Sequence, residues 1–261
     1  MQLEVISYEA EGEAKPRPIL FVHGAWHGAW CWDAHFLPYF AERGYHVHAL
    51  SLRGHGGSPG DVKWASLRQY VDDVAAVAAT LDPHPILVGH SLGGMITQKY
   101  LQRNSERVPA AVLLATGPFV GTLPMTLRLA VGFPRISLDL VREFSLYPVV
   151  STPERAKAVF FSEEMPLETV AGYQAQMGDE SFRMLADTMG LDLPTPFTPQ
   201  CPVYVLGGLR DTVFTVRELQ QTARAYGAQA AFLDMAHDLM LEPNWQVAAN
   251  AILAWLDEQG L

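Results

Sequence analysis

The sequence has few cysteines, no long apolar run and no excess of basic residues. Only Cys31 and Cys201 occur among 261 residues, far apart and outside any C-x-x-C spacing, so no disulfide framework is expected. No stretch approaches the ~18–20 uninterrupted apolar residues of a membrane span. The start, Met1 to Glu9, lacks the basic residues and apolar run of a signal peptide. These absences favour a protein of a reducing compartment, and we expect a cytoplasmic location.

Acidic residues outnumber basic ones, 28 against 18, which gives a formal net charge of −10. A surface of that sign repels phosphate backbones, so no nucleic-acid partner is expected. Hydrophobic residues make up 49% and charged residues 18% of the chain, which is typical of an ordered globular protein. The length is sufficient for one large α/β domain with a sizeable buried core.

Short apolar runs alternate with longer segments of helical periodicity, which is typical of a mostly parallel sheet with crossover helices. Several runs are apolar without alternation, as expected when helices cover both faces of the sheet. The predicted strands are 3–8, 19–22, 45–50, 86–88, 111–115, 203–206 and 230–233. The predicted helices are 30–42, 67–81, 92–103, 216–226 and 245–256.

The segment 117–199 interrupts this alternation, because it has no clear strand and is rich in Pro, Met and Phe. At this length it is expected to be mostly helical. We interpret it as a helical cap inserted into an α/β core of residues 1–116 and 200–261, over the carboxyl edge of the sheet. Ordinary core-facing helices are the alternative interpretation.

The motif Gly89-His90-Ser91-Leu92-Gly93 lies between a predicted buried strand and a predicted helix. This is G-x-S-x-G in the context that a nucleophile elbow requires. A sharp turn there exposes the Ser91 hydroxyl, and the two glycines remove side chains that would collide across the turn. Ser91 is therefore the candidate nucleophile; a glycine-rich turn with an incidental serine is the alternative.

A serine hydroxyl needs a base to take its proton. In this arrangement the chain order is Ser, then Asp or Glu, then His, and His237 is the only histidine after Ser91. Asp211, which follows the strand 203–206, is the candidate acid that orients His237. The rival acids are Asp234, Asp238, Asp187 and Asp192.

Two backbone N–H groups are candidates for an oxyanion hole, those of Leu92 and Ala25. Gly24 lets the chain turn towards the substrate after the strand 19–22, and the N–H of Trp26 is the rival to that of Ala25. Trp26 and His90 are the candidate substrate-binding residues. Trp26, Trp30 and Trp32 fit an acyl pocket or a set of core aromatics equally well.

The chain resembles the α/β-hydrolase superfamily over essentially its full length, in His23-Gly24, the elbow, Asp211 and His237. The run from His23 to Trp32 resembles small esterases close to the plant methylesterase and hydroxynitrile lyase group. The tail from His237 to Pro243 resembles bacterial esterase and lysophospholipase-like members. The resemblance implies an eight-stranded sheet, helices on both faces and a variable cap, whereas only seven strands are found in the sequence.

Residues at a few positions also distinguish between the reactions that members of this superfamily catalyse. Haloalkane dehalogenases and epoxide hydrolases have an aspartate where Ser91 stands. Hydroxynitrile lyases of the similar group have a threonine at Gly24 and a lysine at Asp238. The expected activity is therefore serine-dependent hydrolysis of an apolar carboxylic ester through an acyl-enzyme. Cofactor-free perhydrolases or haloperoxidases, lactonases and non-catalytic ligand-binding relatives remain alternatives.

The expected reaction requires no cofactor and no metal. His46 and His48 share a strand face, but we interpret them as packing residues because no carboxylate or cysteine cluster accompanies them. The expected partner is a small-molecule ester, and the chain is expected to be a monomer or homodimer.

Overall fold

Seven strands form one sheet in the computed structural model, which describes residues 1–261. Their order is β1-β3-β2-β4-β5-β6-β7. β1 is antiparallel to β3, and the other five pairs are parallel. The strands are β1 (Val5–Tyr8), β2 (Ile19–Val22), β3 (Val47–Leu50), β4 (Ile86–His90), β5 (Ala111–Leu114), β6 (Val203–Gly208) and β7 (Gln229–Leu233).

The mostly parallel sheet predicted from the sequence is confirmed. All seven predicted strands form, with bounds that differ by no more than two residues. The central strands are continuous apolar runs: all four residues of β2 and of β5 are fully buried. This burial requires cover on both faces of the sheet, because parallel strands of this composition pack against helices on either side.

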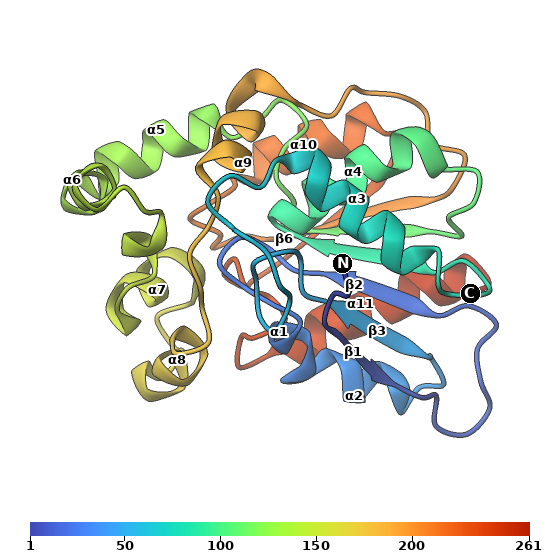
Figure 1. Cartoon of the computed structure of the whole chain (residues 1–261). Coiled ribbons are helices and arrows are strands. Elements are labelled where there is room, and N and C mark those ends of the chain that lie inside the picture. Colours follow the sequence, from blue (N-terminus) through green and yellow to red (C-terminus); the bar gives the residue numbers. More distant parts are fainter.

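Helices cover the two faces of the sheet. Figure 1 shows α3, α4 and α10 on one face and α1, α2 and α11 on the other. Side chains of Ser66 and Thr215 cap the first turns of α3 and α10, each within a capping box. The bounds are α1 (Trp30–Asp33), α2 (Phe36–Ala41), α3 (Leu67–Ala78), α4 (Leu92–Asn104), α10 (Val216–Ala225) and α11 (Trp245–Glu258).

One helix prediction is wrong in part. The segment 30–42 forms α1 and α2 rather than a single helix. The break is at His35, whose φ of −148° and ψ of −50° are not helical. His35 stacks on Trp245 with ring centroids 4.8 Å apart, and Trp32 on the other side of the break is fully buried. Packing of these aromatic rings accompanies the break, which periodicity alone did not indicate.

The connections reverse direction between β2 and β4. The chain passes from β2 to β3 on one side, then returns across the sheet to β4 on the other side of β2. In open α/β sheets a crevice forms at such a switch point, outside the carboxyl ends of the strands. The loop after β2 and the turn after β4 therefore lie next to each other.

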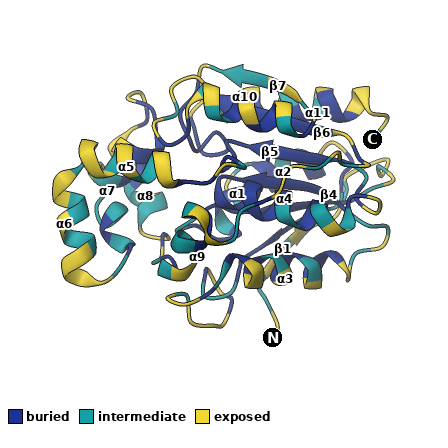
Figure 2. Ribbon diagram, turned by 90° about the horizontal axis from the view of Figure 1, so that it is seen from above, coloured by how far each residue is buried: buried dark blue, intermediate teal, exposed yellow.

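The segment 117–199 contains helices and no strand. Its elements are α5 (Leu123–Gly132), α6 (Pro134–Glu143), η1 (Tyr147–Val149), α7 (Pro153–Phe160), α8 (Leu167–Gln174), α9 (Phe182–Ala186) and η2 (Asp187–Leu191). They lie beside one edge of the sheet in Figure 1, and the outer surfaces of α5 and α6 are exposed in Figure 2. None of the helices combines the length and hydrophobicity needed to cross a bilayer.

Candidate active site

Ser91 lies in the turn between β4 and α4, with a φ of +52° and a ψ of −116°. This conformation is strained for a residue with a side chain, and such strain is typical of functional turns. The turn is tight: a Cβ on Gly89 would collide with the carbonyl oxygen of Gly93 and with Oγ1 of Thr97. Glycine is therefore required at position 89, and the turn holds the Ser91 hydroxyl at the carboxyl end of β4.

His237 connects Ser91 to Asp211. Nε2 of His237 lies 3.0 Å from Oγ of Ser91, and Nδ1 lies 2.8 Å from Oδ2 of Asp211. The other carboxylate oxygen of Asp211 accepts the backbone N–H groups of Val213 and Phe214, at 2.7 and 3.0 Å. These two bonds fix the carboxylate, which in turn fixes the imidazole with Nδ1–H donating and Nε2 free to accept the serine proton.

Two opposing effects set the pKa of His237. Burial disfavours the imidazolium, because the ring is only 1% exposed. The carboxylates of Asp211 and Asp238 outweigh burial, so the pKa of His237 lies above its ordinary value of 6.5. An imidazole with a raised pKa is a stronger base, but it must lose its proton before it can act.

Two loops bring backbone N–H groups towards Ser91. Leu92 is the first residue of α4, so its N–H has no acceptor within the helix. In the loop 23–27 after β2, the N–H groups of Ala25 and Trp26 donate to no protein acceptor. Both remain candidates to pair with that of Leu92 at a developing oxyanion.

An apolar cavity of about 160 Å³ opens beside Ser91 and His237. An engineered cavity of roughly 150 Å³ binds benzene, so this volume suits a ring or a short acyl chain. The apolar lining comes from α4, from α5 to α7 and from the loop after Asp211; it includes Met95, Met125, Leu129, Phe133, Leu140, Phe160 and Phe214. Ser91 itself is 9% exposed, so a reacting group has to enter this cavity.

The model of the alpha/beta hydrolase family matches residues 19–249 of the chain. This match includes every residue of the site described above. The chain belongs to the α/β hydrolase family. The family resemblance inferred from the sequence is thereby confirmed.

The names of several relatives of this α/β hydrolase describe different activities. A pyrethroid hydrolase from Sphingobium wenxiniae is 32% identical over 155 residues, which are 56% of this chain and 55% of that protein. Esterase PIR7B from Oryza sativa subsp. japonica is 35% identical over 39% of this chain and 40% of its own length. A non-heme haloperoxidase from Rhodococcus erythropolis is 38% identical over 39% of this chain and 38% of its own length.

The matches to these curated relatives span about half of their length or less. The likeness in fold extends further. A thermophilic esterase structure from Thermogutta terrifontis superposes with a TM-score of 0.75 over 98% of this chain and 94% of that one, at 20% identity.

The rival acids lie away from Nδ1 of His237. Asp234 is largely exposed and pairs with Arg210. Asp187 pairs with Arg183, and Asp192 with Lys99. Asp238 is buried, but its carboxylate faces His27 rather than the ring of the neighbouring His237. Of the acids considered, Asp211 is the one that hydrogen-bonds to His237.

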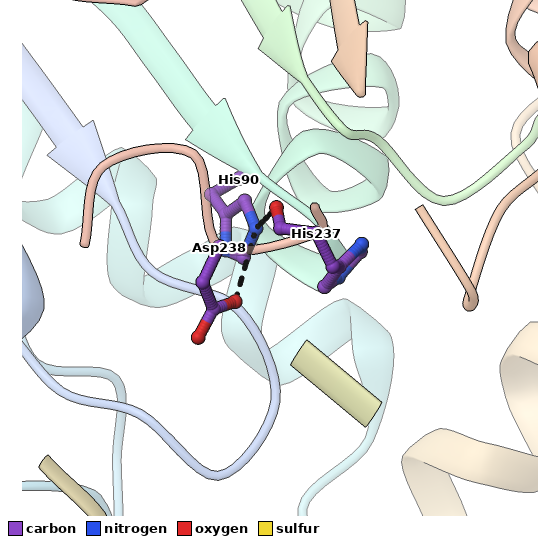
Figure 3. A group of neighbouring side chains, drawn as sticks. All are labelled: His90, His237 and Asp238. Carbon is purple, nitrogen blue, oxygen red and sulfur yellow. Dashed lines mark hydrogen bonds and ion pairs between the residues drawn. The ribbon is translucent and has the colours of Figure 1, made fainter. Parts of the chain in front are cut away.

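His90, His237 and Asp238 form a compact group, shown in Figure 3. One ligand-type atom of each lies within 4.8 Å of the others, a spacing compatible with a metal ion. Both ring nitrogens of His237 are already hydrogen-bonded, to Asp211 and Ser91. A metal ion there would have to displace one of these bonds, so the arrangement fits the triad better than an ion.

His90 is the last residue of β4 and is 1% exposed. Its Nε2–H donates to the carbonyl oxygen of His237 at 3.1 Å. Burial and the neighbouring His237 lower its pKa to about 3, so the ring is neutral. This candidate substrate-binding residue borders the cavity, and its nitrogen holds the backbone of His237.

The three tryptophans divide between cavity and core. Trp26 lines the cavity, and its indole N–H donates to the carbonyl oxygen of Leu146 in the segment 117–199, at 3.1 Å. Trp32 is fully buried in the core. Trp30 stacks on His27 and Tyr173.

No motif in the sequence indicated a role for His27, although its ring lies beside the site. Its ring is 1% exposed and lies between the carboxylate of Asp238 and the carbonyl oxygen of Ala25. In the sequence, Asp238 stands out only as a rival acid and as a position at which hydroxynitrile lyases differ. The available signal was the presence of two histidines in the short loop after β2, His23 and His27.

Proposed function

We propose that this α/β hydrolase cleaves carboxylic esters with an apolar acyl or alcohol part, through an acyl-enzyme on Ser91. One observation carries the proposal. Asp211, His237 and Ser91 form a continuous hydrogen-bonded chain at the wall of an apolar cavity. This is the geometry by which a base activates a serine hydroxyl.

In the proposed reaction Nε2 of His237 accepts the Ser91 proton while Oγ attacks the ester carbonyl carbon. The N–H group of Leu92, together with that of Ala25 or its rival Trp26, donates to the oxyanion that forms. His237 returns the proton to the leaving alcohol as the C–O bond breaks. Water then attacks the acyl-enzyme with His237 again as base, which releases the acid and restores Ser91.

The cavity supports an apolar substrate. Methionine, leucine and phenylalanine side chains dominate its lining, and methionines adapt to ligands of different shape. The names of the pyrethroid hydrolase and the rice esterase also support hydrolysis of small esters. We further propose that residues 117–199 act as a cap on the core of residues 1–116 and 200–261, because α5 to α7 supply much of this lining.

A panel of p-nitrophenyl esters of graded acyl length tests the activity, together with a fluorophosphonate that labels reactive serines. We expect turnover by the wild-type chain and labelling at Ser91. Ser91→Ala should lose both while its circular dichroism spectrum stays unchanged. Substantial turnover by the folded Ser91→Ala chain would contradict the mechanism, and an unlabelled Ser91 would favour a non-catalytic ligand-binding role.

The Rhodococcus haloperoxidase among the relatives supports a second candidate, perhydrolysis on the same triad. Hydrogen peroxide would then replace water as the nucleophile that attacks the acyl-enzyme, giving a peracid and free Ser91. Peracid formation can be followed by the oxidation of bromide in the presence of acetate and peroxide. A rate above that of ester hydrolysis would make perhydrolysis the main activity. Lactones in the same panel test the lactonase alternative.

A further inference from the structure

A second carboxylate–imidazole pair lies beside the triad. Nε2 of His27 is 3.0 Å from Oδ2 of Asp238, and the two side chains are 1% and 0% exposed. The other ring nitrogen, Nδ1, is 2.7 Å from the carbonyl oxygen of Ala25. Neither residue belongs to the chain of bonds between Asp211, His237 and Ser91.

Both nitrogens of His27 therefore face oxygen acceptors. A carbonyl oxygen has no proton to donate, so Nδ1 must carry one. The pKa of Asp238 lies below its ordinary value: burial opposes ionisation, but the imidazoles of His27, His90 and His237 outweigh it. An ionised Asp238 requires a proton on Nε2 as well. Two donor nitrogens, one towards Ala25 and one towards Asp238, are the hydrogen-bonding pattern of an imidazolium paired with a carboxylate.

Besides His237, two other titratable groups face this pair, and both are uncharged. Nε2 of His90 lies 3.6 Å from Oδ1 of Asp238, and that ring is neutral because its pKa is about 3. Burial raises the pKa of the nearby Cys31 thiol, so it is uncharged. The His27–Asp238 ion pair is therefore the charged pair of this pocket beside the triad.

The bond to Ala25 orients a peptide of the loop 23–27. In a trans peptide the C=O and N–H groups point in opposite directions. His27 holds the carbonyl oxygen of Ala25, which turns the N–H of Trp26 the other way. His23 does the same one peptide earlier: Nδ1–H donates to the carbonyl oxygen of Gly24 at 2.7 Å, which sets the N–H of Ala25.

The two imidazoles differ in charge. Nε2 of His23 accepts the backbone N–H of Leu52 at 3.0 Å, so this ring has one proton and is neutral. Burial holds its pKa well below the ordinary value. His27 is held by a carboxylate that belongs to the residue after the catalytic base. The ion pair thus joins the loop of His237 to the loop of Ala25 across the site.

We propose that Asp238 and His27 are positioning residues, whose ion pair fixes the peptide between Ala25 and Trp26 relative to His237. The proposal rests on the proposed ester hydrolysis, in which the N–H groups of this loop meet the oxyanion. Loss of the pair should weaken binding of the transition state more than binding of the substrate.

Asp238→Asn tests this with little change in shape. The hydrogen bond to His27 can persist, with the amide N–H of the new side chain donating to Nε2, but the charge is gone and the ring loses one proton. We expect kcat for a p-nitrophenyl ester to fall about 10- to 100-fold, the scale of a misplaced catalytic group. Affinity for a trifluoromethyl ketone, whose adduct with Ser91 has an oxyanion, should fall by a similar factor. Affinity for the matching methyl ketone should stay within about threefold, because it forms no comparable adduct.

Asp73→Asn is the matched control. Asp73 is 3% exposed and pairs with Arg53 at 2.6 Å, outside the cavity lining. Both variants should lower the melting temperature, but Asp73→Asn should leave kcat and the ratio of the two ketone affinities unchanged. A purely structural role of Asp238 predicts that the two variants behave alike, and that result would overturn the proposal.

The protonation of His27 can be measured independently of activity. Nitrogen-15 NMR of the wild-type chain should show two protonated nitrogens on the His27 ring at neutral pH. A neutral ring overturns the proposal, even if Asp238→Asn does not fold. If wild-type protein shows no turnover and no labelling at Ser91, the proposed function fails instead, and the NMR result still decides the charge of the pair.

Discussion

Asp211 and Asp238 are buried carboxylates that contact different imidazoles. Asp211 accepts two backbone N–H groups with one oxygen and His237 with the other, so its hydrogen bonds fix the position of the carboxylate. Asp238 pairs with His27 and makes no hydrogen bond to the ring of His237. At the scale of single residues, hydrogen-bond partners and not burial distinguish the triad acid from its rival.

The pH dependence of activity follows from the raised pKa of His237. In the proposed mechanism the neutral ring of His237 is the active base, so kcat/KM should rise with pH through its pKa. We expect the midpoint of this acid limb above pH 6.5, because the carboxylates of Asp211 and Asp238 favour the imidazolium. Initial rates with a p-nitrophenyl ester, followed at the isosbestic wavelength of p-nitrophenol, measure it. A midpoint below 6.5 would contradict the assigned environment of the base.

Removal of the charge of Asp211 should affect activity far more than folding. Asp211→Asn is expected to lower kcat on the order of ten thousandfold, the scale known for the same change in another serine triad. The physical reason is the loss of the tautomer with Nδ1–H donating and of the partner for the imidazolium. Asp234→Asn is the control, since that carboxylate lies largely exposed beside Arg210; similar kcat values for the two variants would contradict the role of Asp211.

At the scale of elements, the two faces of α5 have different surroundings. Met125 and Leu129 line the cavity, whereas Leu127 and Val131 are 59% and 83% exposed on the outer surface. The inner face of α5 therefore affects the space available to substrate, while the outer face does not.

Leu129→Phe should shorten the acyl chain that the cavity accepts. The larger ring reduces the free volume, so kcat/KM for long-chain esters is expected to fall about tenfold relative to acetate. Leu127→Phe adds the same ring to the outer face of α5 and should leave the ratio of long-chain to acetate rates unchanged. An equal change in that ratio for both variants would show that the helix acts through stability instead of pocket shape.

At the scale of the whole molecule, the site depends on the sheet. Ser91, Asp211 and His237 follow β4, β6 and β7, and Ala25 follows β2. Parallel pairing from β2 through β7 brings the ends of these strands to one edge. The core that holds the strands in register therefore also sets the distances within the triad.

Leu87→Ala should lower stability without removing catalytic groups. Leu87 is fully buried in β4, between β2 and β5. The cavity left by truncation should cost about 2–5 kcal/mol in the free energy of unfolding. Urea unfolding measures this change, and kcat per folded molecule should stay near the wild-type value. Leu209→Ala, at a position 56% exposed, should change stability by less than about 0.5 kcal/mol; an equal loss in both would contradict this account.

The fold and the triad arrangement were predictable because they depend on local patterns and on chain order. Continuous apolar runs indicated strands covered on both faces, and G-x-S-x-G between strand and helix indicated the turn at Ser91. The break at His35 was not predictable, because its position reflects packing of aromatic rings and not periodicity. The choice between Trp26 and Trp32 as cavity residues also required the packed structure.

The sequence by itself determined the mostly parallel sheet, the strained turn at Ser91 and the order of its partners, since each follows from neighbours along the chain. Only the tertiary structure decided that Asp238 contacts His27, a residue 211 positions away. The strand connections of a crossover fold bring such residues together, and no local pattern records which distant side chain a buried carboxylate will meet. That contact joins Asp238 to the peptide between Ala25 and Trp26, because His27 also hydrogen-bonds to the carbonyl oxygen of Ala25.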